Sequence, residues 1–167
     1  KRVALLDTDP QGSLGKWLDI REETLGVNAS LRFATATAYG ISRAIREVGG
    51  EADVILVDTP PKADSDVRWV MRESNLVLIP VSVGLADVWA THDLLELADR
   101  AGKRVGEQVA KSVAELEAKQ LQASLANKVI YAEALGSGLG VIEVKRTGSA
   151  SDEVRGLAKE VSAILGL

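Results

Sequence analysis

Two short stretches of the sequence place carboxylates directly after an apolar run. Asp7 and Asp9 follow the run at residues 3–6, and Asp58 follows the run at residues 54–57. An uncompensated charge at the end of a buried strand is costly. Mg2+ is a suitable partner, because it prefers carboxylate oxygens together with water and phosphate ligands. The pattern favours a hydrated magnesium site that serves phosphate chemistry, while turn capping by the aspartates is the simpler alternative.

The elements that must position these aspartates are indicated by hydrophobic patterning. Unbroken apolar runs at residues 3–6, 54–57 and 76–79 are typical of parallel strands buried on both faces. Residues 41–48 and 85–101 have helical spacing between or after these runs, which predicts a doubly wound α/β sheet flanked by helices. Ligands in such sheets bind at the carboxyl ends of the strands, where the aspartates lie. The same spacing predicts helices over residues 105–121 and 151–165.

Composition limits the remaining possibilities. The 167 residues suit one domain, and the lack of cysteine excludes disulfide, thiolate and cysteine-nucleophile chemistry. We find no apolar run long enough to span a bilayer, so the cytoplasm is the expected location. The net charge of -4 argues against an overall basic surface. The final third is less acidic, because residues 101–167 carry 9 basic and 8 acidic side chains, against 4 and 10 in residues 51–100.

The first carboxylate motif also carries a family resemblance. Residues 7–13 (DTDPQGS) resemble a signature motif of the ParA partition ATPases, a deviant Walker branch of the P-loop NTPases. Residues 54–61 are similar to the Walker B strand of that family, and residues 74–80 resemble the strand that follows it, with Asn75 where the family usually has Asp. Residues 127–134 and 150–161 resemble later blocks. The resemblance implies a P-loop NTPase fold over residues 1–167 and ATP hydrolysis with Mg2+.

The resemblance implies roles for individual residues as well. Asp9 matches the carboxylate that orients the attacking water, and Asp7 and Asp58 match groups that hold magnesium through its waters. Thr59 and Pro60 match the loop that senses the γ-phosphate.

Two departures from the family pattern lead us to expect an incomplete domain. A phosphate loop would precede Asp7 and is not found, and residues 12–17 lack the glycine spacing of such a loop. We expect the absent loop strand to lie between the strands that end at Asp7 and Asp58. A second family strand is expected to be missing near residues 103–105, where residues 101–104 run into the helix predicted from residue 105.

Family members dimerise around ATP, bind nonspecific DNA and respond to a ParB-like or cargo adaptor partner. The resemblance therefore implies plasmid or chromosome partition, or the positioning of a cargo, in a cytoplasmic protein associated with the nucleoid. Lys128, Lys145 and Arg155 are the DNA-binding candidates, with a solvated helix face as the alternative. Residues 160–167 contain no Lys or Arg, so the basic membrane tail of the MinD relatives is not expected. The alternative function is a non-catalytic interaction module with the same fold.

Several other residues have simpler interpretations. The glycine-rich residues 136–140 fit a turn better than an anion cradle. His92 fits a surface position, and Trp17, Trp69 and Trp89 fit packing roles.

Overall fold

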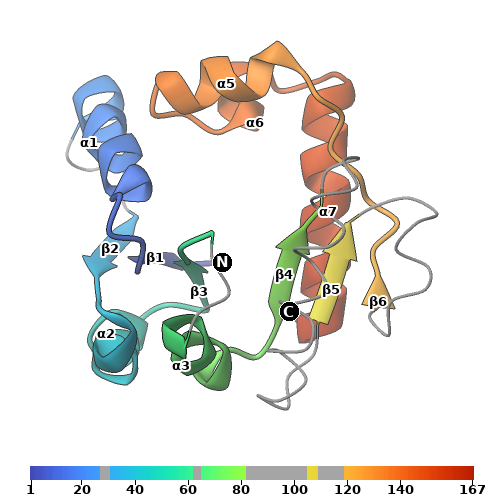
Figure 1. The fold of residues 1–167 in the computed structure, drawn as a ribbon. Helices are drawn as coiled ribbons and strands as arrows, with labels where there is room; N and C mark the ends of the chain where they lie inside the picture. Colours follow the sequence, from blue (N-terminus) through green and yellow to red (C-terminus); the bar gives the residue numbers. More distant parts are fainter. Residues whose placement is uncertain (27–30, 62–64, 82–104, 109–118) are drawn as a thin grey trace. The chain divides into compact units, whose positions relative to one another are not determined.

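The computed structural model describes residues 1–26, 31–61, 65–81, 105–108 and 119–167. Two compact units make up the chain (Figure 1). The first contains Lys1–Glu73 and Ala132–Gly140, and the second contains Ser74–Tyr131 and Val141–Leu167.

The first unit is built on a parallel sheet of three strands. Strand β1 (Val3–Asp7) is central, with β2 (Arg32–Thr35) on one side and β3 (Val54–Asp58) on the other. The register runs from Val3 opposite Val54 to Asp7 opposite Asp58. The predicted strands that end in aspartate are therefore confirmed, and their carboxyl ends meet at one edge of the sheet.

The expectation that another strand lies between these two strands is wrong. β1 and β3 pair directly over all five positions, and the pairing is closed at both ends. The Arg2 amide donates to the Asp53 carboxylate at 2.8 Å, and the Thr8 amide donates to the Asp58 carbonyl at 3.0 Å. Because each strand satisfies the inward-facing backbone groups of the other, no vacant position exists between them.

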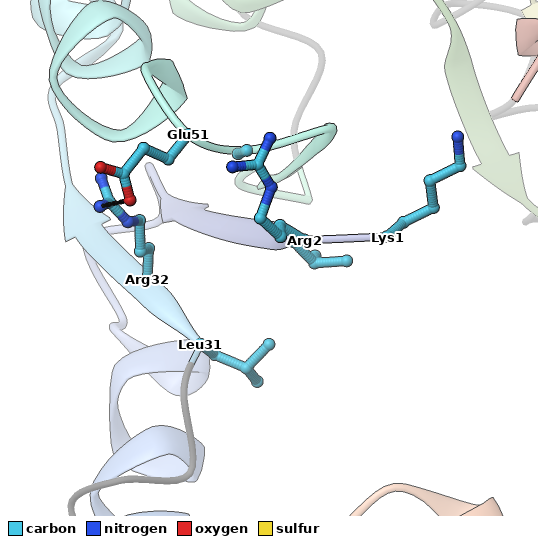
Figure 2. Close-up of a pocket in the computed structure, with 7 residues that line it drawn as sticks. Lys1, Arg2, Leu31, Arg32 and Glu51 are labelled. Atoms are coloured by element: carbon cyan, nitrogen blue, oxygen red, sulfur yellow. Dashed lines mark hydrogen bonds and ion pairs between the residues drawn. The ribbon is translucent and has the colours of Figure 1, made fainter.

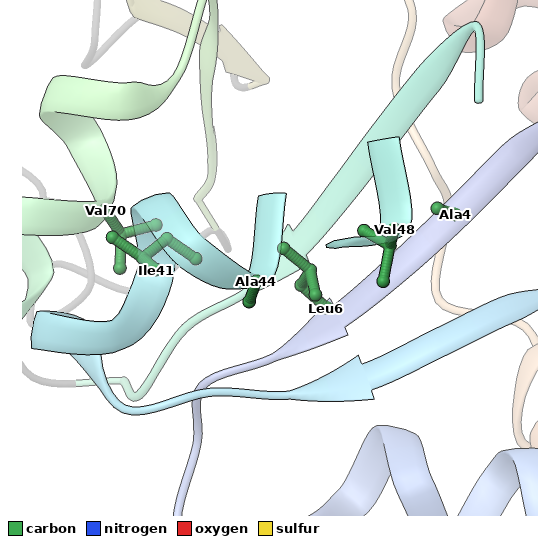
Figure 3. Packing of buried hydrophobic residues seen from close by; sticks show 6 residues of the cluster. All are labelled: Ala4, Leu6, Ile41, Ala44, Val48 and Val70. Carbon is green, nitrogen blue, oxygen red and sulfur yellow. The ribbon is translucent and has the colours of Figure 1, made fainter. Parts of the chain in front are cut away.

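Helices cover the two faces of this sheet unequally. Ala4 and Leu6 are fully buried against Ile41, Ala44 and Val48 of α2 (Ile41–Gly49), as Figure 3 shows. Val70 of α3 (Ser65–Glu73) completes this core cluster. The short 3-10 helix η1 (Ala38–Gly40) leads into α2, whose predicted helical pattern is confirmed.

The opposite face carries helix α1 (Ser13–Leu25). Side chains alternate along a strand, so Leu5, its register partner Phe33 and the β3 residue Leu56 share this face. A Cβ placed on Gly15 of α1 would lie 3.4 Å from the Phe33 ring, which shows that α1 packs on β2. Leu56 remains 51% exposed at the edge strand.

The second unit contains another parallel sheet of three strands, in the order β4 (Val77–Pro80), β5 (Val105–Gln108) and β6 (Lys119–Gln120). The helix predicted over residues 105–121 is wrong at both ends, since residues 105–108 and 119–120 are strands. Parallel pairing of Val77 with Val105 and of Pro80 with Gln108 stabilises the extended form, which overrides the local helical spacing. Residues 109–118 and the predicted helix at residues 85–101 lie outside the described residues.

Three helices complete the described chain: α5 (Val129–Gly136), α6 (Val141–Val144) and α7 (Ser149–Leu165). Helix α7 confirms the predicted closing helix and begins two residues earlier than expected. Asp152 lies in its first turn, where a negative charge is favourable. The predicted α/β class, with parallel strands flanked by helices, is confirmed.

Candidate functional site

Asp7 is the anchor of the strand-end site. Its side chain is 2% exposed, and its carboxylate accepts hydrogen bonds from the Asp9 amide at 3.0 Å and the Gly15 amide at 3.2 Å. These bonds compensate the buried charge and join the end of β1 to the first turn of α1. Asp7 therefore fixes the loop that carries Asp9.

Asp9 shapes the tight turn between β1 and α1. Its Oδ1 accepts a hydrogen bond from the Gln11 amide at 2.9 Å, and its carbonyl accepts one from Gly12 at 2.9 Å. Gly12 precedes α1 with a φ of 64°, a conformation that favours glycine. The DPQG sequence thus forms a compact turn that leaves the Asp9 side chain partly exposed at the carboxyl end of β1.

Asp58 lies beside this turn, opposite Asp7 in the parallel pair. Its side chain keeps solvent exposure, yet desolvation raises the pKa of its carboxyl, and the negative charges of Asp7 and Asp9 raise that pKa further. The Thr59 amide opposes the shift by donating to the Asp58 carboxylate. The structure therefore brings three predicted site residues together in one electrostatically coupled group, with Thr59 and Pro60 in the segment that follows.

The oxygen atoms that Asp7, Asp9 and Asp58 offer decide whether this group can hold the predicted magnesium ion. Within the described residues, no set of three or more His, Cys, Asp or Glu side chains is arranged to hold a metal ion. Two carboxylates with water and phosphate oxygens are nevertheless a donor set that Mg2+ uses. Desolvation, and after it repulsion from Asp7 and Asp9, raises the pKa of Asp58, and a cation there would relieve the repulsion. The residues fit a hydrated Mg2+ contacted through water, with Asp58 more accessible than Asp7.

The pocket in Figure 2 lies at the other end of the same sheet. It is lined by residues at the starts of the strands, among them Lys1, Arg2, Leu31 and Arg32. Arg32 Nη2 and Glu51 Oε2 form an ion pair at 2.5 Å on its rim. Because parallel strands start at one edge and end at the other, this pocket is separate from the carboxylate group.

The three predicted DNA-binding residues are in different situations. Arg155 lies on α7 with its side chain 46% exposed, donates to the Arg146 carbonyl at 2.5 Å and forms a surface ion pair with Asp152 at 3.5 Å. Lys145 is exposed on the connection between α6 and α7. Arg155, Arg146 and Lys145 therefore form a basic group at the start of α7. Lys128 differs from them, because its ion pair with Glu153 is largely shielded from solvent, whereas the Arg155–Asp152 pair is exposed.

Sequence reasoning missed the structural role of two glutamates on α7. Glu153 accepts hydrogen bonds from Lys128 and from the Tyr131 hydroxyl at 2.7 Å. These donors, Lys128 first, lower the pKa of Glu153 to about 2, while burial and Glu153 raise the pKa of Tyr131 to about 12. Glu160 accepts from the Gln122 and Ala123 amides at 2.9 and 2.6 Å. Two glutamates seven residues apart lie on the same face of a helix, and this spacing in the sequence could have indicated their shared structural role.

The glycine-rich residues 136–140 form a turn, as predicted. Gly138 has a φ of 66° and lies directly against the backbone of α1 at Arg21. Trp17 is partly buried under Arg21, which lies 5.4 Å from its ring centroid. Trp69 is 38% exposed, and its ring packs beside that of Tyr39 with a centroid distance of 5.8 Å. His92 and Trp89 lie outside the described residues.

The fold defined by these elements is that of the MinD and ParA-type partition proteins. A chain of the MinC:MinD cell division protein complex of Aquifex aeolicus superposes with a TM-score of 0.70 at 14% identity, covering 98% of this chain and 84% of that chain. A structure described as a partition protein superposes with a TM-score of 0.52 at 18% identity, covering 99% of this chain and 61% of that chain.

By sequence, the chain is similar to maintenance of carboxysome distribution protein A. The identity to the Halothiobacillus neapolitanus protein is 24% over 180 residues, spanning 96% of this chain and 82% of that protein. The identity to the Gloeobacter kilaueensis protein is 40% over 102 residues, spanning 60% of this chain and 44% of that protein. No protein-family model matches the chain. None of the described helices has the length and apolar character needed to cross a membrane.

Proposed function

We propose that the chain belongs to a ParA-like ATPase that positions a cytoplasmic cargo or partitions DNA. The observation that carries this proposal is the group formed by Asp7, Asp9 and Asp58 at the carboxyl ends of two paired parallel strands. Ligands bind at this edge of α/β sheets. The similarity to proteins named for carboxysome distribution and to MinD supports the positioning role.

Each residue of the group has a distinct part in the proposed reaction. Asp9 orients the water that attacks the γ-phosphate, because its side chain lies on an exposed turn that Asp7 fixes. Asp7 and Asp58 hold hydrated Mg2+, and Thr59 and Pro60 contact the γ-phosphate. Mg2+ held there would supply positive charge to neutralise the phosphate groups.

A phosphate loop is needed to complete this site, and we propose that a segment carrying it packs beside β3. Three features support the position: β1 has β2 and β3 on its two sides, β3 is the edge strand among the strands that the structure describes, and Leu56 is 51% exposed on the face that Asp58 shares. An apolar strand exposed along one edge favours the addition of another strand. This position replaces the one predicted between β1 and β3.

Partners follow from the same proposal. The protein dimerises with ATP, binds nonspecific DNA through the basic group at the start of α7, and responds to a ParB-like or cargo adaptor protein. Its location is the cytoplasm, in association with the nucleoid. Plasmid partition, chromosome segregation and protein cargo are all compatible with this chemistry.

The test is ATP hydrolysis and ATP binding by variants of the full-length protein. Asp9→Asn retains an oxygen that can accept from the Gln11 amide, so it preserves the turn while removing the charge. We expect turnover to be abolished, with ATP binding retained, in both Asp9→Asn and Asp9→Ala. Asp58→Ala should instead weaken magnesium-dependent binding. Asp19→Ala, on the exposed side of α1, is the matched control and should behave as wild type.

Wild-type turnover by Asp9→Asn would reject the role assigned to Asp9. If the full-length wild-type protein neither binds nor hydrolyses ATP, the fold serves as a non-catalytic interaction module.

A further inference from the structure

An exposed group of aromatic and arginine side chains lies on the first unit, on the helical layer opposite the face shared by Asp7 and Asp58. Tyr39 of η1 is 73% exposed, and its ring centroid is 5.8 Å from that of Trp69 on α3, which is 38% exposed. The Arg72 guanidinium lies 5.6 Å from the Trp69 ring centroid. Arg68 is exposed one turn before Arg72, on the same side of α3. We call these four residues the Tyr39–Trp69 surface.

The core holds this surface firmly from beneath. Val67, Val70 and Met71 of α3 are buried, and Val70 packs in the cluster with Ile41 of α2 (Figure 3). The Ser42 hydroxyl also donates to Glu73 Oε1 at 2.7 Å, which ties α2 to α3. A rigid backing lowers the entropy that a binding surface loses when it meets a partner.

Folding alone does not account for the charges on this surface. Arg2, Arg32 and Arg43 form ion pairs with nearby carboxylates. Arg68 and Arg72 have no carboxylate partner within the part of the chain that the structure describes. Among the side chains that the structure describes, two guanidinium groups without a carboxylate partner therefore flank an exposed aromatic pair, in a chain of net charge -4.

We propose that the Tyr39–Trp69 surface binds an acidic peptide segment of a partner protein. Arginine binds carboxylates with two parallel hydrogen bonds, which a peptide bearing Asp or Glu would supply. Tryptophan, tyrosine and arginine are also the residue types that contribute most to protein interfaces. Duplex DNA is less suited, because its affinity comes from many phosphate contacts along a basic stripe, whereas this surface has two guanidinium groups.

The experiment measures binding of labelled peptides to the full-length protein by fluorescence anisotropy. The probe is a peptide that alternates Asp and Glu with Leu, and its matched control replaces each acid by the corresponding amide. A third probe is single-stranded oligothymidylate, which tests stacking of bases on the aromatic pair. We expect saturable binding of the acidic peptide, at least tenfold tighter than that of its amide counterpart.

Variants then locate the binding. Trp69→Ala and Arg72→Glu should each weaken acidic peptide binding by about tenfold or more, the effect expected at the centre of an interface. Arg72→Lys should weaken it less, because it keeps the charge and removes only the paired donors. Arg46→Glu, an equivalent charge change on exposed α2, is the control and should leave binding unchanged. ATP turnover should be unaffected in all four variants, which separates this result from the test of the ATPase proposal.

Three results would overturn the proposal. They are equal binding of the acidic and amide peptides, unchanged binding in Arg72→Glu, and binding of the oligonucleotide alone. Circular dichroism identifies a variant that does not fold, and Arg72→Gln then serves as the milder substitution at that position.

Discussion

Replacing Gly138 by alanine should destabilise the protein by separating a turn from helix α1. An added Cβ would lie 2.3 Å from the Arg21 amide nitrogen, 2.6 Å from the Arg21 Cα and 2.7 Å from the Ile20 carbonyl carbon. These are backbone atoms of a helix, so no side-chain rotation relieves the clash. The residue at this position also has a φ of 66°, which alanine adopts at a cost.

The magnitude follows from the interactions that the displaced turn gives up. A left-handed conformation costs about 1–2 kcal/mol for an ordinary residue. One hydrogen bond joins the turn to α1, from Arg21 Nη1 to the Gly138 carbonyl at 3.1 Å, and Thr24 Oγ1 shares its single proton between the Ser137 carbonyl at 3.1 Å and the Ile20 carbonyl at 2.8 Å. The Arg21 hydrogen bond contributes about 0.5–1.5 kcal/mol, and the Thr24 hydroxyl keeps its Ile20 partner when the turn is displaced. Together the backbone cost and the lost hydrogen bond lower the free energy of unfolding by about 1.5–3.5 kcal/mol.

Urea unfolding of the full-length protein, followed by circular dichroism, measures this change. Gly136→Ala is the matched control, since it lies two residues away at the end of α5 and a Cβ there meets no atom within 4 Å. We expect Gly136→Ala to change stability by less than about 0.5 kcal/mol. If Gly138→Ala unfolds at the same urea concentration as wild type, the turn does not pack on α1 and the reasoning is refuted. If added phosphate stabilised the wild type but not Gly138→Ala, the turn would be an anion site instead.

The remaining predictions concern the second unit. Because the folded pKa of Glu153 is about 2, below its ordinary value of 4.5, its contribution to stability is complete above pH 4.5 and disappears as the pH falls toward 2. Unfolding measured across that range should show a weaker pH dependence in Glu153→Gln, and an identical dependence would count against the ion pair with Lys128. The second prediction concerns DNA binding by the ATP-bound full-length protein. The double variant Arg155→Glu with Lys145→Glu should bind random duplexes more weakly. The slope of log affinity against log salt concentration should also fall in magnitude by about 0.9 for each phosphate that the variant no longer neutralises. Lys128→Met is the control, because the Lys128 ammonium forms a largely shielded ion pair with Glu153. Unchanged DNA affinity in the double variant would show that the basic group is only a solvated surface.

Local elements with strong periodic signals can be predicted from the amino-acid pattern alone. Strands β1 and β3, helix α2 and helix α7 all lie where apolar runs or helical spacing predict them. Their ends were also readable, because aspartate directly after an apolar run marks the carboxyl end of a strand. The grouping of Asp7, Asp9 and Asp58 followed from the rule that parallel strands end at a common edge.

Tertiary structure decided the features that depend on residues distant in the sequence. Direct pairing of β1 with β3 depends on backbone groups some fifty residues apart, for which a local pattern holds no signal. Residues 105–108 have helical spacing, yet pairing with β4 makes them a strand. Lys128 reads as a free basic residue until α7 places Glu153 against it. In each case the energy of a long-range interaction exceeds a local preference worth a fraction of a kcal/mol per residue, so only the folded chain shows the outcome.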